Sequence, residues 1–283
     1  MDDLPARGFL SYFWHLETSV FMEIITSRAN RLIVETAKLQ DRKHRQREKL
    51  FFFEGRKLLD EAIQKNVPLV RVFVTEENAA LLQALPAGVE QYTVSRSVYE
   101  KISAENSPEG VFCVARHLDR LHKFATIYNM CEKGSRFMAV SVRDPGNLGT
   151  ILRSARAMGI DCLLLSSDCA DLYHPRTIRG AMGALFSLPT LTLTDMEASV
   201  AALQKKGYHV YAAALTDSAC DVRKVKITPA TCFMVGNEGH GLPESLVSAA
   251  DQAVIIPMQP GSESLNVAAA SSLLLWEMGK VIL

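Results

Sequence analysis

The strongest constraint on the fold is an alternation of strand-like apolar runs with helical stretches, from about residue 136 to the C-terminus. The runs FMAVSV, CLLLS, YHVYAAA, CFMVG and AVIIP are short, apolar and rich in strand-forming residues. Helices are expected between or after them at 148–158, 175–183, 195–206, 243–250 and 264–279. Strands separated by helices form a largely parallel sheet that helices cover on both faces. The sequence therefore predicts an α/β domain over 136–283.

A second alternation, within residues 22–118, predicts a smaller mixed α/β domain ahead of the first. We expect a basic helix at 29–47, then the strand FFFEG and a helix with Leu58 and Leu59 on its apolar face. Further strands are expected at VRVFVT, EQYTV and GVFCVA, and further helices at AALLQAL and SVYEKI. Residues 119–135 lack strong periodicity and are expected to link the two domains. A chain of 283 residues is long enough for two cores.

The first 21 residues do not resemble a signal peptide, because no basic region is followed by an apolar stretch and a cleavage site. Met22 looks like a more natural start, so 1–21 is expected to be a leader that is poorly ordered or follows a misassigned start codon. No apolar run approaches the roughly 18 residues of a membrane span. The six cysteines form no C-x-x-C pair, which predicts a reduced, cytoplasmic protein.

The stretch FMVGNEGHGL ends a predicted strand in a loop with three glycines, at positions 236, 239 and 241. Glycine is favoured where φ is positive or where another group approaches the backbone closely, so the loop predicts a ligand site. The order is G-x-x-G-x-G and not the G-x-G-x-x-G of dinucleotide folds. Glu238 is either a cap for the next helix or a fixed acceptor in a pocket. His240 has no companions at ligand spacing, so no metal is predicted, and an ordinary Gly/Asn turn remains the alternative.

The stretch RDPGNLGTILRSARAMGI at 143–160 predicts a helix with a polar start. Asn147 is expected to be its N-cap. Arg153 and Arg156 lie three residues apart, away from the apolar stripe. They are either solvated charges or a fork that presents donors to an anion such as an RNA phosphate.

The third polar cluster lies at 253–279, where a strand ending in Ile-Ile-Pro passes through a polar loop into a helix that starts at Ser264 or Leu265. Two such loops after parallel strands meet at one edge of the sheet, which is where ligands bind in open α/β sheets. Three successive alanines from Ala268 give the helix a small face for close packing, for instance against a second subunit. An ordinary amphipathic C-terminal helix is the alternative.

Together these motifs resemble the SpoU/TrmH branch of the SPOUT methyltransferases, which transfer a methyl group from S-adenosylmethionine to a ribose 2′-hydroxyl in RNA. The resemblance covers 136–283. It rests on four motifs: Asn147 with Arg153 six residues later, the glycine loop from Gly236 to Gly241, Ile256-Pro257-Met258, and Ser264-Leu265-Asn266-Val267. It implies a trefoil-knotted parallel-sheet domain, an exception to the rule that chains do not thread loops.

The resemblance also implies the residues of the site and a homodimer that completes the RNA site across two knotted domains. The arginine that matches Arg153 would orient RNA and stabilise the developing oxyanion, or act as the base. Ala268 departs from the family pattern, which often has Ser there. The implied catalytic residues are Asn147, Arg153, Glu238, Ser264 and Asn266. The implied cofactor-binding residues are Met234, Gly236, Asn237, Gly239, Ile256, Met258, Leu265 and Ala268.

The region before the linker resembles the ribosomal-protein-like substrate domain of rRNA-directed members, which implies 23S rRNA as the substrate. The formal net charge of the chain is zero, so an RNA partner must meet a local patch. Between Arg28 and Lys57 there are ten Lys or Arg against four Asp or Glu, which fits phosphate contact or a solvated helix. The alternatives are a tRNA 2′-O-methyltransferase and a non-catalytic RNA-binding or ribosome-assembly protein.

Overall fold

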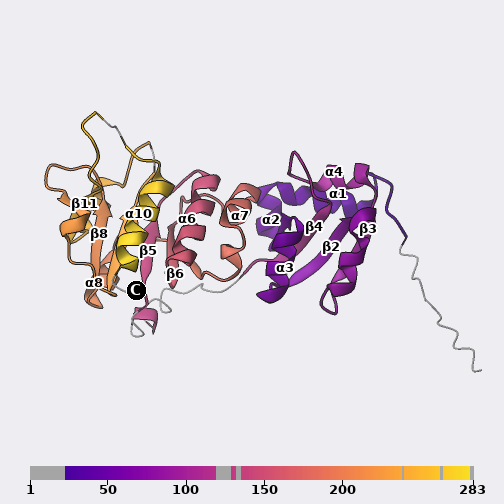
Figure 1. The fold of residues 1–283 in the computed structure, drawn as a ribbon, viewed down its shortest axis with the longest axis horizontal. Helices are drawn as coiled ribbons and strands as arrows, with labels where there is room; N and C mark the ends of the chain where they lie inside the picture. Colours follow the sequence, from indigo (N-terminus) through magenta and orange to yellow (C-terminus); the bar gives the residue numbers. More distant parts are fainter. Residues whose placement is uncertain (1–22, 119–128, 132–134, 238, 262–263, 281–283) are drawn as a thin grey trace, which may run out of the picture.

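The computed structural model describes residues 23–118, 129–131, 135–237, 239–261 and 264–280 (Figure 1). They form two α/β domains that follow each other along the long axis of the molecule. The expected leader, most of the expected linker and Glu238 lie outside the described residues.

The N-terminal domain is built on a four-stranded sheet in the order β1-β4-β2-β3. Strands β1 and β2 both run antiparallel to β4, and β3 runs parallel to β2, so the sheet of this predicted α/β domain contains both pairings. Phe52, Phe73 and Phe112 pack on one face with α1 and α4, whereas Phe51 and Phe53 point to the other. The strands are β1 Leu50–Glu54, β2 Leu69–Thr75, β3 Glu90–Val94 and β4 Val111–Arg116. The α-helices are α1 Arg31–Ala37, α2 Arg42–Glu48, α3 Arg56–Gln64 and α4 Arg96–Ile102.

The single basic helix expected at 29–47 is wrong, because α1 and α2 are separated by a 3-10 turn, Lys38–Gln40. Asp41 has an extended backbone and begins a new helix, its side chain accepting a hydrogen bond from the Lys43 backbone nitrogen at 3.2 Å. Short acidic side chains compete in this way with a continuing helix and favour a new N-cap. The helix expected at AALLQAL is instead part of a 3-10 segment, Glu76–Ala84.

The C-terminal domain contains a sheet of seven described strands in the order β7-β6-β5-β10-β8-β11-β9. Every strand pair in it is parallel, which confirms the predicted sheet type. Its two edge strands, β7 and β9, were not expected from the sequence, and β9 has only two residues. The strands are β5 Phe137–Val140, β6 Cys162–Ser166, β7 Thr190–Leu193, β8 His209–Ala213, β9 Cys220–Asp221, β10 Thr231–Val235 and β11 Gln252–Ile255.

Helices cover both faces of this sheet. Leu148 of α6, Ile178 of α7 and Leu274 of α10 belong to the core on one face, and Leu203 of α8 and Leu246 of α9 belong to the core on the other. The helices are α6 Pro145–Ala157, α7 Pro175–Ala181, α8 Met196–Lys205, α9 Glu244–Ala249 and α10 Val267–Gly279. Among the described residues, no helix is long and apolar enough to cross a membrane.

Two predicted helix starts need correction. Helix α6 begins at Pro145 with Asp144 as its N-cap, so the prediction that Asn147 caps this helix is wrong. Asp144 accepts from the Asn147 backbone nitrogen at 2.9 Å, and proline suits the first helical position because its missing N–H would have no partner there. Helix α10 begins at Val267 after the N-cap Asn266, later than expected.

The two domains share one apolar core. Phe53 of β1 and Phe186 of the C-terminal domain have ring centroids 5.1 Å apart, and Phe51 and Tyr173 are 4.8 Å apart. The same cluster of buried side chains continues into α6 and α7. The N-terminal domain therefore packs directly on the α7 side of the C-terminal domain.

Candidate functional site

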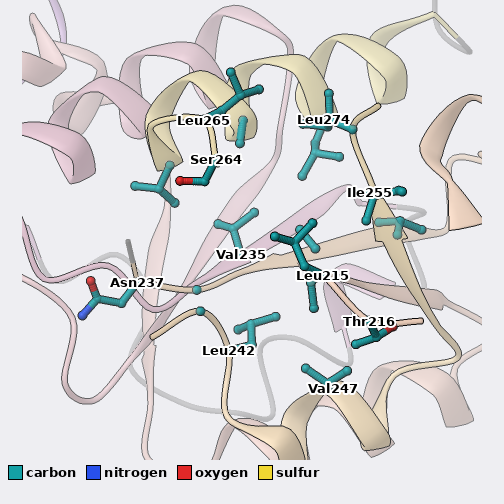
Figure 2. Close-up of a pocket in the computed structure, with 18 of the residues that line it drawn as sticks. Leu215, Thr216, Val235, Asn237, Leu242, Val247, Ile255, Ser264, Leu265 and Leu274 are labelled. Carbon is teal, nitrogen blue, oxygen red and sulfur yellow. The ribbon is translucent and has the colours of Figure 1, made fainter. Parts of the chain in front are cut away.

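A cavity of about 580 Å³ opens at the carboxyl ends of β8, β10 and β11 (Figure 2). These strands are neighbours in the sheet, so the loops that follow them meet at one edge, as predicted for two of them. The end of β8 and the loop after it, 213–216, were missed because the order of strands in a sheet cannot be read from local sequence. The lining is largely apolar and includes Leu215, Val235, Leu242, Val247, Ile255 and Leu274.

The glycine loop closes on itself. The Asn237 nitrogen donates to the Gly241 oxygen at 3.1 Å, and the Gly241 nitrogen donates back to the Asn237 oxygen at 2.8 Å. A Cβ at Gly236 would lie 2.2 Å from the Gly241 carbonyl carbon and 2.3 Å from the Leu242 nitrogen. Glycine is thus required at 236 by the backbone of the loop itself, and Gly241 adopts a positive φ of 64°.

The cavity lining contains most of the residues predicted to hold a cofactor. Gly236, Asn237, Ile256, Met258 and Leu265 line it, together with Ser264 from the predicted catalytic set. Figure 2 shows Ser264 and Leu265 at the start of α10, above the cavity.

Three predicted cofactor residues lie outside the lining. Met234 is 1% exposed and belongs to the core on the face of the sheet that α8 and α9 cover. Gly239 is exposed. Ala268 is 3% exposed and packs into the core beneath α10.

Two predicted catalytic residues, 119 positions apart, are in direct contact. The Asn266 side-chain nitrogen donates to the Asn147 side-chain oxygen at 3.0 Å. The Asn266 oxygen also accepts from the backbone nitrogens of Ala268 and Ala269 at 2.9 and 3.3 Å, and so caps α10. One asparagine therefore fixes the start of α10 and joins it to the first turn of α6.

Arg153 lies apart from the cavity. It is exposed and does not line the cavity, and its side chain makes no hydrogen bond or ion pair to another residue in the described part of the chain. Arg153 follows Asn147 by six positions, which is about 9 Å along a helix. Arg156 differs, because its Nε donates to the Ser187 hydroxyl at 3.0 Å. Glu238, also predicted to be catalytic, lies outside the described residues.

The loop that leads into α6 is held by Asp168, which lies just after the end of β6. Asp168 accepts from the Ser166 hydroxyl at 2.7 Å and from Arg143 at 2.9 Å. These two hydrogen bonds, that from Ser166 first, hold the pKa of the Asp168 carboxyl below its usual value. Sequence reasoning missed this contact, since nothing in either segment signals that the two loops are adjacent. In the described ranges, no group of three His, Cys, Asp or Glu side chains could hold a metal ion.

The basic segment of the N-terminal domain presents fewer free charges than its sequence suggests. Arg45 is 1% exposed and paired with Asp171, and Lys38 and Arg47 pair with acidic neighbours. Exposed cations of this segment that have no ion pair within the described residues include Arg42, Lys43 and Lys49.

Comparisons with known proteins match both domains. Residues 135–276 match the SpoU rRNA Methylase family, and residues 30–113 match the MRM3-like substrate binding domain. The 23S rRNA (guanosine(2553)-2′-O)-methyltransferase RlmP of Bacillus subtilis is 28% identical over 257 residues, which cover 91% of this chain and 99% of that protein.

Solved structures agree over nearly the whole chain. An AdoMet-bound rRNA methyltransferase from Sinorhizobium meliloti superposes with a TM-score of 0.82 and 27% identity, over 92% of this chain and 98% of the other. An RNA 2′-O ribose methyltransferase superposes with a TM-score of 0.75 and 30% identity, over 92% and 99% of the two chains.

Proposed function

The chain belongs to the SpoU rRNA methylase family, and we propose from this that it transfers a methyl group from S-adenosylmethionine to a ribose 2′-hydroxyl of RNA, with 23S rRNA as the substrate. The observation that carries the proposal is the cavity at the sheet edge, bordered by the start of α10, where Asn266 is bonded to Asn147. The substrate assignment is supported by the match of residues 30–113 to a substrate-binding domain and by the name of the Bacillus relative.

The cavity fits the proposed cofactor. Its apolar lining suits a flat adenine ring, and the backbone of Gly236, Ile256 and Leu265 offers donors and acceptors at the rim. Thr216, Asn237 and Ser264 add polar side chains. When bound, S-adenosylmethionine supplies the methyl group and its electrophilic carbon. The other predicted cofactor residues, Met234, Gly239 and Ala268, would then act only by supporting the loops.

The chain must position a ribose hydroxyl that is poorly acidic and stabilise the oxygen as negative charge develops on it. A guanidinium is effectively always charged, so we assign Arg153 to orienting the RNA and stabilising the oxyanion. Asn147, Ser264 and Asn266 would complete the hydrogen-bond frame beside the cavity, and Glu238 is assigned to the same frame from its place in the glycine loop.

The position of Arg153 favours a homodimer. Its exposed side chain does not line its own chain's cavity, so a second copy could bring an Arg153 to each site. Helix α10 also exposes apolar side chains one turn apart, with Leu273 45% and Trp276 50% exposed. Exposed apolar surface of this kind is typical of an interface. Light scattering at micromolar concentration should give twice the mass of one chain, and a monomer would contradict the composite site.

We further propose the domain division predicted above, with 22–118 as the RNA-binding domain, 119–135 as a linker and 136–283 as the methyltransferase domain. Similarity to the family supports a trefoil knot in the C-terminal domain and a cytoplasmic location, where rRNA is found. The described cysteines are all free thiols, which fits a reducing compartment.

The decisive experiment uses purified full chain, cofactor labelled in its methyl group, and 23S rRNA, 16S rRNA and tRNA from cells that lack the gene. Label should enter 23S rRNA at one nucleotide whose 3′ bond then resists alkaline hydrolysis, because the 2′-oxygen is blocked. A 2′-deoxy nucleotide at that position should abolish transfer. Label in tRNA alone would replace the rRNA assignment, and label in no RNA would refute the methyltransferase assignment.

A further inference from the structure

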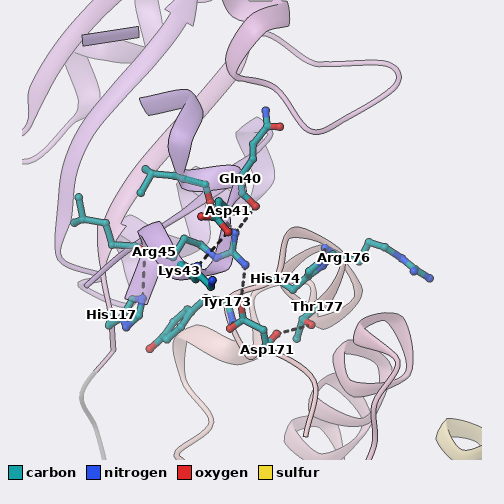
Figure 3. Close-up of polar contacts among 12 residues, drawn as sticks. Gln40, Asp41, Lys43, Arg45, His117, Asp171, Tyr173, His174, Arg176 and Thr177 are labelled. Atoms are coloured by element: carbon teal, nitrogen blue, oxygen red, sulfur yellow. Dashed lines mark hydrogen bonds and ion pairs between the residues drawn. The ribbon is translucent and has the colours of Figure 1, made fainter. Parts of the chain in front are cut away.

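Arg45 is a basic residue whose environment does not suit contact with RNA. It lies in the basic helix α2, yet its side chain is 2% exposed. Its Nη1 donates to the backbone oxygens of Leu39 and Gln40 at 2.7 and 2.8 Å. Its Nη2 donates to the Asp171 carboxylate of the other domain at 2.6 Å (Figure 3). The guanidinium therefore joins the turn between α1 and α2 to the loop between β6 and α7.

Asp171 passes this contact into the body of the C-terminal domain. Its carboxylate also accepts from the Tyr173 backbone nitrogen at 3.1 Å, and its backbone oxygen accepts from the Thr177 hydroxyl at 3.0 Å. Thr177 is fully buried in α7. The Asp171 loop and α7 thus form one hydrogen-bonded unit with little freedom to reorient.

Helix α7 in turn lies against the backbone of α6, which carries Asn147 and Arg153. A Cβ at Gly149 of α6 would lie 2.5 Å from the Thr177 backbone oxygen and 2.9 Å from the Cα of Gly180. Contact at this distance leaves no side chains between the two helices to absorb a displacement. A rotation of the N-terminal domain relative to α7 is therefore also a rotation relative to the proposed catalytic helix.

The apolar part of the junction holds the domains together through buried area. Ring contacts such as Phe53 with Phe186 gain stability from buried area, which is not directional. Hydrogen bonds between a guanidinium and a carboxylate are directional, and they are strong when water is excluded. Arg45 supplies one such bond across this junction, to Asp171.

We propose that Arg45 is a positioning residue which, through Asp171, fixes the orientation of the N-terminal domain and thereby the place of the target ribose in RNA bound across both domains. This inference rests on the proposed function. Exposed cations of the same segment, such as Arg42 and Lys49, would hold the RNA, and Arg45 would set where that RNA lies relative to Arg153.

The test compares full-chain Arg45→Met with Glu105→Gln. Glu105 pairs with Arg179 across the same junction, but the Arg179 side chain is 71% exposed. Glu105→Gln therefore removes an exposed ion pair between the domains and leaves the buried Arg45–Asp171 pair intact. For Arg45→Met we expect kcat to fall about 10- to 100-fold, the scale of an ångström-sized misplacement. Its affinities for S-adenosylmethionine and RNA should stay within about threefold, because neither binding surface is altered. Glu105→Gln should keep kcat within about twofold, as expected for an exposed pair.

Two further readouts separate positioning from a general loss of structure. Arg45→Lys keeps the charge but not the planar fork, so it should recover part of kcat, and methylation by Arg45→Met should spread to neighbouring nucleotides. If Arg45→Met fails to bind cofactor, Asp171→Asn replaces it, with the same expected fall in kcat. A wild-type kcat and a single methylated nucleotide in the folded variant would overturn the positioning role. Absence of methylation by the unaltered chain would instead refute the proposed function.

Discussion

The cavity at the sheet edge and the domain junction are held by different kinds of contact. At the cavity, the glycine loop is closed by backbone hydrogen bonds between Asn237 and Gly241, and the lining is mostly apolar. At the junction, one buried guanidinium bonds a carboxylate of the other domain. The cavity should therefore be sensitive to changes that move the backbone, whereas the junction should be sensitive to the identity of single side chains.

The largest effect is expected from Gly236→Val, which tests the backbone side of this comparison. Any Cβ at 236 would overlap the Gly241 backbone, so the loop must open and the cavity must change shape. Affinity for S-adenosylmethionine should fall by about 100-fold or more, measured by titration calorimetry. The circular dichroism spectrum should stay unchanged, because the strands beneath the loop are not touched.

Gly239→Ala is the matched control in the same loop. A Cβ at Gly239 would meet no atom within 4 Å, and alanine keeps the backbone amide. Cofactor affinity should stay within about threefold, since no contact is lost. Equal losses in the two variants would mean that the loop needs flexibility and not close backbone approach.

The features that the sequence predicted well are the local ones. Apolar runs and the helices between them gave the sheet type, because strand and helix periodicities are visible within a few residues. The glycine loop was noticed from three glycines within six residues, and Gly236, Asn237 and Gly241 line the cavity; its role as a ligand site stays a prediction. The loop 213–216 was missed because it borders the cavity only through the position of β8 between β10 and β11.

The burial of Arg45 could not be predicted from the sequence for a related reason. Arg45 looks like its basic neighbours in α2, and only packing against the Asp171 loop distinguishes it. The N-cap prediction at Asn147 failed because two capping residues, Asp144 and Asn147, precede the apolar stripe of α6, and the helix used the earlier one.

The next largest effect is expected from Arg153→Ala, which removes a side chain without disturbing the cavity. Methyl transfer should fall by about 100-fold, the scale for removing one preorganised donor. Cofactor affinity should change less than about twofold, because Arg153 does not line the cavity. Single-turnover methylation and calorimetry on the same preparation measure the two quantities.

Two variants sharpen this prediction. Arg153→Lys should restore little activity, since lysine lacks the planar fork. Arg156→Ala loses only the bond to the Ser187 hydroxyl and should cost less than about threefold. A more damaging Arg156→Ala would contradict the assignment of Arg153.

A smaller effect is expected at Asn266, whose side chain bonds both the backbone of α10 and the side chain of Asn147. Asn266→Ala removes the cap of α10 and the bond to Asn147, and loss of a cap costs about 1 kcal/mol. The thermal midpoint should fall by about 2–4 °C for a chain of this size. Asn266→Asp keeps the capping oxygen but not the amide donor. It should retain the midpoint and lose methyl transfer, and an unchanged transfer rate would show that the Asn147 contact is only structural.

The smallest effect concerns pH at the junction. His174 is the N-cap of α7, and its Nδ1 accepts from the Arg176 backbone nitrogen at 3.1 Å. Burial, and then the positive charge of Arg45, lower the pKa of His174, while Asp171 raises it. Smaller effects come from Arg176, which lowers this pKa, and from Asp144, which raises it. Because the folded pKa lies below the unfolded value of about 6.5, the unfolded chain takes up this proton first. The contribution of His174 to the free energy of unfolding is therefore favourable above about pH 6.5. It is lost as the pH falls through that value toward the folded pKa.

His174→Asn isolates the effect of His174 protonation on stability, since asparagine is a good cap that does not titrate. Between pH 8 and pH 5.5, the thermal midpoint of the unaltered chain should fall about 2 °C further than that of His174→Asn, the scale of one weakened cap in a chain of this size. The other histidines are common to both proteins, so their titration cancels in the difference. Scanning fluorimetry across this range measures it directly. Parallel profiles would show that protonation of His174 leaves the cap of α7 intact.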